Sequence, residues 1–371
     1  MIYRAIGAMS GSSLDGLDIA FAEFQENAGK WSYEIKEADC YSYSDAWIKE
    51  LKTATSLNAL DYQLLHVAYG HYIGQQINKF IDEKKLNYQV ALISSHGHTS
   101  FHIPSRQTTA QLGDGAAIAA ETQLPVVSDL RSLDLAFGGE GAPIVPIGEK
   151  LLLGDYNYFL NVGGIANISF NGEPYVAFDV CAANRVLNML ASEVGENYDE
   201  GGRLAKKGKI DQQLLNSLNG LDYYKKPFPK SLANEFGTAI VYPMIRDSGS
   251  EIHDALRTYV EHIVSQIGEA ISDGQRSMPA GRTGGLNVQH SMLVTGGGAF
   301  NDFLIERLKE KLAGLNVGVV VPDEKLVKYK EAMIMAFMGV LRWRQEYNVL
   351  SSVTGASRDN IGGALWIGQE A

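Results

Sequence analysis

Cysteine is nearly absent from this sequence, which has only Cys40 and Cys181 among 371 residues. So few cysteines exclude a disulfide framework and are typical of proteins from a reducing compartment. No apolar run is long enough to cross a membrane, and the first residues lack the apolar core of a secretory signal. These absences predict a cytoplasmic protein with no membrane partner.

Positive charge is scarce as well. The 32 Lys and Arg face 43 Asp and Glu, giving a formal net charge of −11, and no basic run occurs. This balance argues against a nucleic-acid-binding surface. It does not exclude nucleotides, because backbone amides and a metal can carry the charge of a phosphate. The length is sufficient for two domains, each with a sizeable core.

What the chain does contain is a set of glycine-rich turns, the first of them within residues 6–24. An apolar strand enters at Ile6, and an alternating run leaves at 19–22. Between them lie Gly11, Ser12, Ser13, Asp15, Gly16 and Asp18. Glycines, hydroxyls and free N–H groups can form an anion-binding concavity. Two carboxylates beside an anion require a bridging cation such as Mg²⁺. The turn therefore predicts a nucleotide-phosphate loop with a metal at Asp15 and Asp18, and the alternative is an ordinary hairpin turn.

Two further stretches carry the same signal. Residues 158–180 read as a strand, the turn Gly163-Gly164, and two more strands, of which the last ends on Asp179. Residues 292–301 read as a strand, then Gly296, Gly297 and Gly298, then a helix start at Asn301. Three glycines before a helix allow phosphates to approach its N-terminus, whereas close strand–helix packing would explain one glycine better than three. Two glycine-turned hairpins and a strand–GGG–helix turn resemble the plan of the actin/hexokinase/Hsp70-like ATPases.

The wording of the motifs is more specific. In this order, the sequence contains GAMSGSSLDGLD, SSHGHTSFHIP, QLGDGAAIAAET, SDLRSLDLAFGGEGAPIVP, NVGGIANISF, TGGGAFN and VLSSVTGAS. From Gly7 to about Gly363 the chain closely resembles the anhydro-N-acetylmuramic acid kinase family. The resemblance implies an α/β, two-domain actin-like ATPase (ribonuclease H-like) fold with a nucleotide and substrate cleft between the domains. We place the domains at residues 1–134 with 355–371 and at residues 135–354, with the chain crossing in 136–146.

The resemblance also implies an activity. Members of the family use ATP and Mg²⁺ to open 1,6-anhydro-N-acetylmuramic acid with water and to phosphorylate its O6. The products are N-acetylmuramic acid 6-phosphate and ADP, in peptidoglycan recycling. A small-molecule sugar is therefore the expected substrate, and a homodimer the expected assembly.

Asp179 is the candidate catalytic residue. A carboxylate at a strand's carboxyl end can act as a general base, and the alternative is a cap on the following helix. The family resemblance favours the base. The chain departs from the family just after it, because residues 179–184 read DVCAAN where the family usually has Asp-Thr-Gly-Pro-Gly-Asn. Glu140 likewise stands where the family commonly has Gln. These departures leave the exact sugar open.

Arg131 is the candidate for binding an anionic group of the sugar. Arg131 offers a planar fork for a carboxylate or phosphate, and the lactyl carboxylate of a muramic sugar would suit it. The alternative for Arg131 and Asp134 is an interdomain salt bridge. By resemblance, His96 and Thr99 line the sugar pocket and Glu331 faces it, although Glu331 could simply be a solvated first-turn acid.

Two other classes of function stay open on the sequence. One is a nucleotide-dependent binding protein of the same fold without sugar kinase activity, or a kinase for a related sugar. The other is a metal hydrolase using His96, His98 and His102, whose spacing is loose for a zinc site.

Periodicity predicts helices at 61–84 and 330–347 and strands at 31–43, 90–95, 126–129 and 317–321. Composition predicts a turn into a helix within 110–121 and a surface loop at 275–289.

Overall fold

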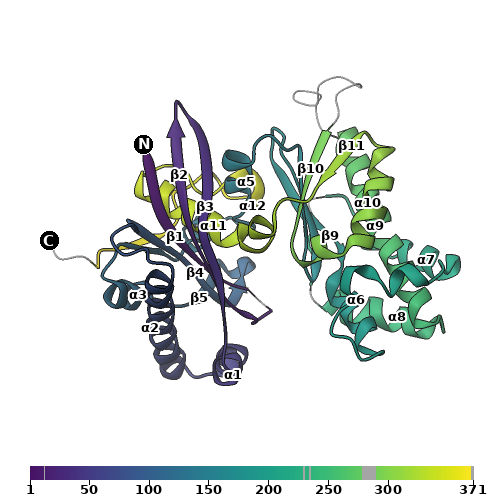
Figure 1. Cartoon of the computed structure of the whole chain (residues 1–371), viewed down its shortest axis with the longest axis horizontal. Coiled ribbons are helices and arrows are strands. Elements are labelled where there is room, and N and C mark those ends of the chain that lie inside the picture. The colour runs from purple at the N-terminus through teal and green to yellow at the C-terminus, as the bar shows by residue number, and fades with distance from the viewer. Residues whose placement is uncertain (12, 229, 234, 278–289, 369–371) are drawn as a thin grey trace. The chain divides into compact units, whose positions relative to one another are not determined.

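The computed structural model describes residues 1–368 except 12, 229, 234 and 278–289 (Figure 1). It divides into two compact units, the first formed by Met1–Leu153 with Tyr329–Ala371 and the second by Gly154–Lys328. No helix within the described ranges is long and apolar enough to cross a bilayer.

The first unit is built on a mixed sheet. Its strands, in the order β12-β6-β4-β1-β2-β3 with β5 paired to β4, are β1 (Ile2–Ser10), β2 (Gly16–Asn27), β3 (Lys30–Ser42), β4 (Leu92–Ile103), β5 (Thr108–Leu112), β6 (Val126–Ser128) and β12 (Ala364–Trp366). Strands β1 to β3 form an antiparallel meander because tight hairpins join them, and β1, β4 and β6 run parallel.

Helices cover this sheet. They are α1 (Asp45–Thr53), α2 (Ala59–Glu83), α3 (Gly115–Thr122), α4 (Ser132–Ala136), α5 (Pro146–Leu152), α11 (Glu324–Trp343, in this unit from Tyr329 on) and α12 (Ser351–Thr354). The helical spacing of Tyr69, Ile73, Ile77 and Phe80 gives α2 one fully buried face. Helix α11 crosses so close to β1 that a Cβ on Gly7 would lie 1.8 Å from a backbone oxygen of the helix.

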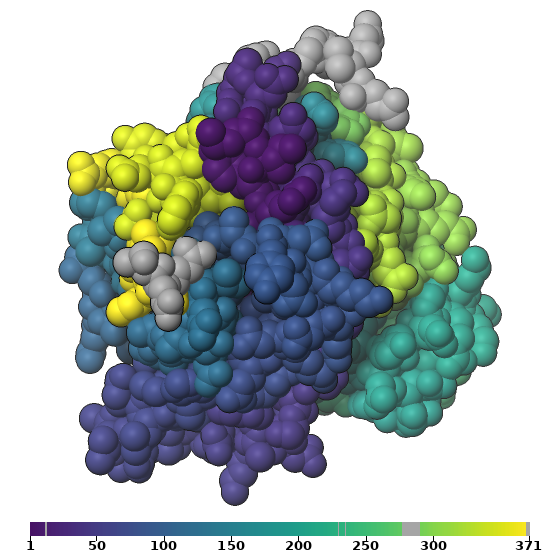
Figure 2. All heavy atoms as spheres, turned by 60° about the vertical axis from the view of Figure 1, so that its left-hand side comes forward, coloured from purple at the N-terminus to yellow at the C-terminus, as the bar shows by residue number. Residues whose placement is uncertain are grey.

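The C-terminal part of the chain closes the first unit beside its N-terminus. Figure 2 shows the yellow C-terminal residues next to the purple N-terminal strands. The guanidinium carbon of Arg344, the residue after α11, lies 5.3 Å from the ring centre of Tyr3 and 5.2 Å from that of Trp31. These cation–π contacts hold segments that are far apart in sequence together.

The second unit repeats the plan. Its strands, in the order β11-β10-β7-β8-β9, are β7 (Tyr158–Val162), β8 (Ile165–Phe170), β9 (Val176–Ala182), β10 (His290–Thr295) and β11 (Val317–Val320). Its helices are α6 (Asn184–Ser192), α7 (Gln212–Asn219), α8 (Tyr242–Asp247), α9 (Ile252–Ser277) and α10 (Asp302–Ala313). Here too a meander of hairpins is followed by parallel strands. This repetition confirms the two related α/β halves that the sequence predicts.

Two details differ from the expectations. The units divide after Leu153 and Lys328, not after 134 and 354, because residues 136–146 fold back on the first unit. For example, the amide of Glu140 donates to the carbonyl of Thr354. Strand β4 continues through the stretch expected to leave it, because β5 pairs with its second half. The turn into a helix expected within 110–121 is confirmed, because β5 ends at Leu112 and α3 begins at Gly115. Most of the expected loop at 275–289 lies outside the described residues.

Candidate active site

The glycine hairpin of the first unit lies between β1 and β2. The pair Ser10–Leu17 closes the hairpin, so the connecting residues extend beyond the sheet. Gly11 is open, since a Cβ there would meet only Ser13 Oγ at 3.5 Å, and Ser13 itself is exposed. Gly16 differs, because a Cβ there would lie 2.7 Å from Cys40 Sγ on β3. Packing therefore explains Gly16, and Gly11 alone offers an open approach. Ser12 lies outside the described residues.

The predicted metal ligands lie near a third acid. The pKa of Asp18 is raised to about 6: burial raises it most, the hydrogen bond from the Cys40 thiol lowers it, and the charges of Glu331 and Asp15 raise it. Asp15 is exposed. A cation would relieve this repulsion, and Mg²⁺ usually takes one or two carboxylates and completes its shell with phosphates and water. The residues therefore fit Mg²⁺ held jointly with a phosphate. Within the described ranges, no group of three or more His, Cys, Asp or Glu could hold a metal alone.

His96 is locked in one neutral form. Its Nδ1 lies 3.0 Å from the carbonyl of Gly97 and must donate to it, while its Nε2 accepts from Arg131 Nε at 2.9 Å. Burial, then the charge of Arg131, lowers the pKa of His96 to about 3. Both ring nitrogens are occupied, so His96 cannot ligate a metal, and His102 is exposed. The metal-hydrolase reading of this region finds no support in the geometry.

Arg131 keeps most of its guanidinium available. Among the residues that the structure describes, no carboxylate pairs with it, and Asp134 in particular does not. Burial lowers the pKa of Arg131 to about 10, and the charge of Glu331 raises it, so the group is a cation at neutral pH. A partly buried cation held by a neutral histidine is prepared for an anionic ligand. Thr99, nearby on β4, is partly buried and accepts only a long contact of 3.5 Å from Gln111.

Asp134 has a different environment from the one predicted. It is fully buried, and its Oδ1 accepts from Thr354 Oγ1 and Asn360 Nδ2, both at 2.8 Å. Its Oδ2 accepts from the amide of Gly141 at 2.8 Å. With both oxygens used inside the protein, Asp134 anchors the surrounding loops, and among the described residues it forms no salt bridge with Arg131.

Sequence reasoning did not identify a buried polar chain beside this site. Ser10 Oγ lies 3.1 Å from Nδ1 of His98 and accepts from the hydroxyl of Tyr43 at 2.8 Å. The Tyr43 hydroxyl lies 2.5 Å from that of Tyr69. These contacts link β1, β4, α2 and Tyr43, the residue after β3, so they fix His98 on β4, the strand that also carries His96 and Thr99. Tyr43 is 33 residues from Ser10 and 26 residues from Tyr69 in sequence, so no local pattern marks this set of hydrogen bonds.

In the second unit the glycine turns converge on the end of β7. Amides of Ala183 and Asn184 donate to the carbonyls of Gly164 and Gly163, at 2.8 and 3.0 Å. Asn184 Nδ2 also donates to the carbonyl of Val162 at 2.9 Å. The glycines after β10 pack on the same place, because a Cβ on Gly296 would lie 2.5 Å from Asn161 Oδ1 and one on Gly298 would lie 2.3 Å from Val162 Cγ1. Gly297 stays exposed. Gly163, Gly164, Gly296, Gly297 and Gly298 thus form one turn cluster, with Asn184 as its link.

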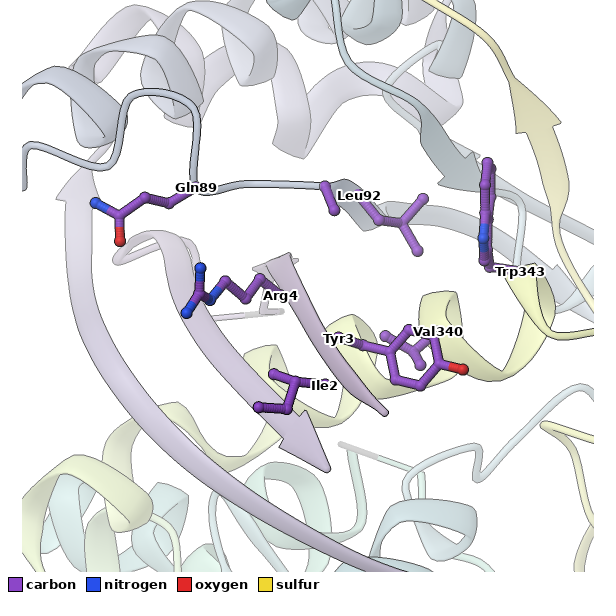
Figure 3. Close-up of a pocket in the computed structure, with 8 residues that line it drawn as sticks. Ile2, Tyr3, Arg4, Gln89, Leu92, Val340 and Trp343 are labelled. Atoms are coloured by element: carbon purple, nitrogen blue, oxygen red, sulfur yellow. The ribbon is translucent and has the colours of Figure 1, made fainter. Parts of the chain in front are cut away.

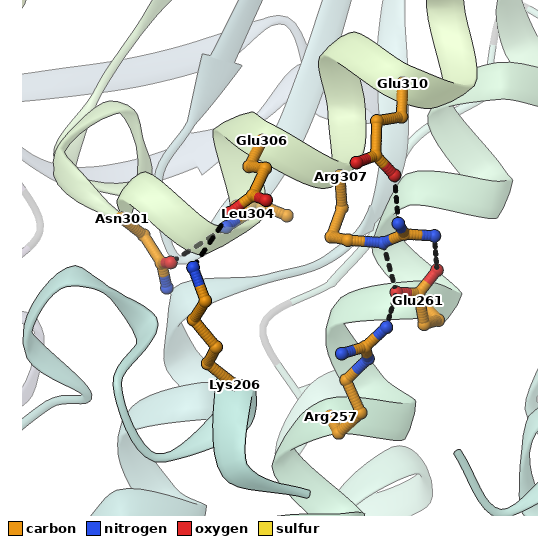
Figure 4. A network of polar contacts seen from close by, with 8 residues as sticks. All are labelled: Lys206, Arg257, Glu261, Asn301, Leu304, Glu306, Arg307 and Glu310. Carbon is orange, nitrogen blue, oxygen red and sulfur yellow. Dashed lines mark hydrogen bonds and ion pairs between the residues drawn. The ribbon is translucent and has the colours of Figure 1, made fainter. Parts of the chain in front are cut away.

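A charged network joins α9 to α10, the helix that follows this cluster (Figure 4). Helix α10 begins directly after it, capped by Asn301, whose Oδ1 accepts from the amide of Leu304. Buried Glu261 on α9 pairs with Arg307 of α10 at 2.7 Å and with Arg257 at 3.2 Å. The network ties the two helices together and so fixes where α10, and the glycines before it, begin.

Asp179 lies on β9 at a β-bulge. Ala166 pairs with Cys181 while the next residue, Asn167, pairs with Asp179, so Val180 is the extra residue. Bulges redirect side chains and are frequent near active sites. The Asp179 Oδ2 accepts from the amide of Leu232 at 2.8 Å and from Ser231 Oγ at 3.2 Å. Among the described residues nothing donates to Oδ1.

The environment of Asp179 suits a base. Burial raises its pKa, and the two hydrogen bonds from residues 231 and 232 lower it. The helix-cap alternative is wrong, because Ala183 is the N-cap of α6 and no side chain caps that helix. A clamp of the main chain was not predicted. The hydroxyl of Tyr223 donates to the carbonyl of Asp179 at 2.6 Å, and the amide of Asp179 donates to the carbonyl of Lys230 at 3.0 Å.

One cavity of about 460 Å³ lies apart from all these residues. It is lined by Ile2, Tyr3, Arg4, Gln89, Ala91, Leu92, Val340 and Trp343, at the amino ends of β1 and β4 (Figure 3). Ligand crevices of α/β sheets lie at the carboxyl ends of the strands, where Ser10 and His98 are found. The lining is mostly apolar and holds one charged side chain, so this cavity is not the catalytic site.

Comparison with known proteins decides among the remaining readings. The family model "Anhydro-N-acetylmuramic acid kinase" matches residues 3–368. The chain belongs to this family. It is 30% identical to the anhydro-N-acetylmuramic acid kinase of Sulfurovum sp. (strain NBC37-1), over 98% of this chain and 99% of that protein. It is 32% identical to that of Aliivibrio fischeri (strain ATCC 700601 / ES114), over 96% of each.

Membership in the anhydro-N-acetylmuramic acid kinase family accounts for the pattern of the two units. A kinase needs positions for phosphates, for a metal and for a base. The glycine turns are the candidates for phosphates, Asp15 and Asp18 for a metal, and Asp179 for a base. The family resemblance drawn from the sequence motifs is confirmed, and the chain is a carbohydrate kinase by family.

Proposed function

We propose that this protein is an ATP-dependent sugar kinase acting on 1,6-anhydro-N-acetylmuramic acid. Water adds to the anomeric carbon, the bond from that carbon to O6 breaks, and O6 takes the γ-phosphoryl group of ATP. The products are N-acetylmuramic acid 6-phosphate and ADP. Family membership over residues 3–368 is the observation that carries the proposal.

Asp179 is the general base in this account. A base needs an oxygen free of donors, and both donors to Asp179 use Oδ2, which leaves Oδ1 to take the proton of water. The raised pKa of the carboxyl makes it a better proton acceptor than an exposed aspartate. The bulge and the contacts from Tyr223, Ser231 and Leu232 hold it in one orientation.

Arg131 binds the lactyl carboxylate of the sugar. His96 orients the guanidinium through Nε2 and, being neutral, does not compete with it for the anion. Thr99 and Glu331 contribute hydrogen bonds to the sugar, and we assign Asp134 to the loops behind it. The departures at Cys181 to Ala183 make the sugar itself the point to test, using analogues with and without the lactyl group.

The nucleotide is held by the glycine turns of both hairpins and by Gly296, Gly297 and Gly298. Asp15 and Asp18 would hold Mg²⁺, which when bound neutralises phosphate charge. Gly11→Val tests the first turn, because the added Cβ would lie no closer than 3.5 Å to its nearest neighbour, Ser13 Oγ, so the fold should stay intact. A sharply higher KM for ATP is expected, and a folded variant with an unchanged KM contradicts the assignment.

Release of ADP tests the whole reaction. We expect ADP to form only when 1,6-anhydro-N-acetylmuramic acid is present, to stop with EDTA and to return with Mg²⁺ alone. ADP formed equally without the sugar, or a requirement for stoichiometric zinc, would overturn the proposal.

We also place the protein in the cytoplasm as a homodimer, on the strength of its few cysteines and of the family resemblance. Both cysteines are free thiols, and Cys181 is buried. Light scattering during size-exclusion chromatography tests the dimer, and a mass equal to one chain at micromolar concentration would contradict it.

A further inference from the structure

Arg185 lies over the Gly163-Gly164 turn of the second unit. Its Nε would be 3.6 Å and its Nη2 3.8 Å from a Cβ placed on Gly164. The residue is partly buried. Within the described part of the chain it makes no hydrogen bond and no ion pair, whereas Arg203, Arg246, Arg257 and Arg307 of the same unit all pair with glutamates.

The position of Arg185 is unfavourable for the helix that carries it. It is the second residue of α6, in the first turn, where the partial charge of the helix is positive. No acidic residue stands in that turn and no side chain caps it. A cation placed there adds repulsion, so helix stability does not explain it.

We propose that Arg185 binds the phosphate chain of the nucleotide at the Gly163-Gly164 turn. The inference rests on the proposed kinase function and adds a residue that the glycine motifs do not contain. A guanidinium forms strong, directed hydrogen bonds with phosphate oxygens. The guanidinium of Arg185 and the positive end of α6 would then both attract the same phosphate. This anion would offset the repulsion between the guanidinium and the helix end.

The neighbours of Arg185 favour phosphate over the carboxylate of the sugar. Asn184, the residue before it, links the Gly163-Gly164 turn to β7, and Gly297 and Gly298 lie against the same asparagine. Phosphate requires such backbone clearance because its oxygens are recognised partly by main-chain amides. A sugar carboxylate has its own candidate in Arg131.

The test compares Arg185→Gln with Arg185→Lys and with Arg203→Gln. Arg203 is a matched control, because it loses the same charge in the same unit from an exposed pair with Glu196. Calorimetry measures the dissociation constants of ATP, ADP and adenosine with Mg²⁺ present, and of the anhydro-sugar separately. Thermal unfolding of each variant checks that it is folded.

Arg185→Gln should weaken ATP and ADP by about 10- to 100-fold, the effect of one charge-assisted hydrogen bond, while adenosine and the sugar bind as before. Arg185→Lys should recover part of the loss, and Arg203→Gln should bind like wild type. A folded Arg185→Gln that binds ATP normally, or that loses the sugar instead, overturns the assignment. If the wild type turns over the sugar and Arg185→Gln binds ATP normally, only the role of Arg185 is refuted. If the wild type itself binds no ATP, both the role of Arg185 and the proposed kinase function are refuted.

Discussion

Changing Asp179 to Asn separates a general base from a residue that only anchors a loop. Asparagine keeps one side-chain oxygen, so it can still accept from the amide of Leu232 and from Ser231 Oγ, which lie 2.8 and 3.2 Å away. It cannot take a proton from water. If Asp179 is the base, turnover should fall by roughly 10² to 10⁴, equivalent to about 2.7–5.5 kcal/mol of transition-state stabilisation.

An anchoring role predicts a much smaller effect. Even the loss of one hydrogen bond costs only about 0.5–1.5 kcal/mol of stability, and asparagine preserves the acceptor. The free energy of unfolding of Asp179→Asn should therefore lie within about 1 kcal/mol of the wild-type value, and the variant should bind both ligands. Ring opening and phosphorylation should disappear together, because O6 becomes a nucleophile only as the anhydro bond breaks.

The assay is product quantification by chromatography, with calorimetric binding of ATP and of the anhydro-sugar. Asp222→Asn is the matched control, since this carboxylate belongs to the same clamping segment and is 94% exposed in its pair with Lys225. The control should retain full activity. Near wild-type turnover by Asp179→Asn would remove Asp179 from the mechanism.

Four further outcomes follow from the described contacts. Ser231→Ala removes one donor to Asp179, so the pKa of the base rises and activity, lost as pH falls, should disappear at a higher pH than in wild type; Ser231→Thr should restore the profile, and identical profiles would argue against the contact. Arg131→Ala should weaken binding of the sugar by about 2–5 kcal/mol and spare ATP; equal loss of an analogue without the lactyl carboxylate would exclude the assignment. Gly296→Ala should destabilise the fold by ~1–3 kcal/mol, because φ is +81° and the Cβ would lie 2.5 Å from a side-chain oxygen, and urea unfolding measures it. Burial lowers the pKa of His262 to about 3, so the free energy of unfolding should fall below pH 6.5, by ~1.4 kcal/mol per pH unit for this residue, and His262→Gln should flatten that slope.

Local patterns predicted most of the fold. Alternation and glycine turns marked the hairpins around residues 11 and 163, and helical spacing marked α2, because each pattern reflects one buried face. Helical spacing also predicted α11, in which residues 332–341 are all buried. Strand β4 was predicted too short, since its second half is rich in serine and histidine and resembles a loop. His96 and His98 are nevertheless buried there, because Arg131 donates to His96 and Ser10 Oγ lies 3.1 Å from Nδ1 of His98.

The candidate site was predicted less completely, and the reason is again distance along the chain. The carboxylate of Asp134 is used by Thr354 and Asn360, more than 200 residues away, so its structural role had no local signal. The bulge at Val180 depends on the register between two strands, which composition does not encode. Arg185 stands outside every glycine motif, and only its position over Gly164 draws attention to it.

The most direct test of the central claim is mass spectrometry of the sugar after incubation with ATP, Mg²⁺ and 1,6-anhydro-N-acetylmuramic acid. The account predicts one product, N-acetylmuramic acid 6-phosphate, formed in equal amount to ADP. Because water adds to the anomeric carbon, the product should gain the mass of one water as well as that of the phosphoryl group. Binding of both ligands with no phosphorylated sugar would contradict the account and would point to a nucleotide-dependent binding protein.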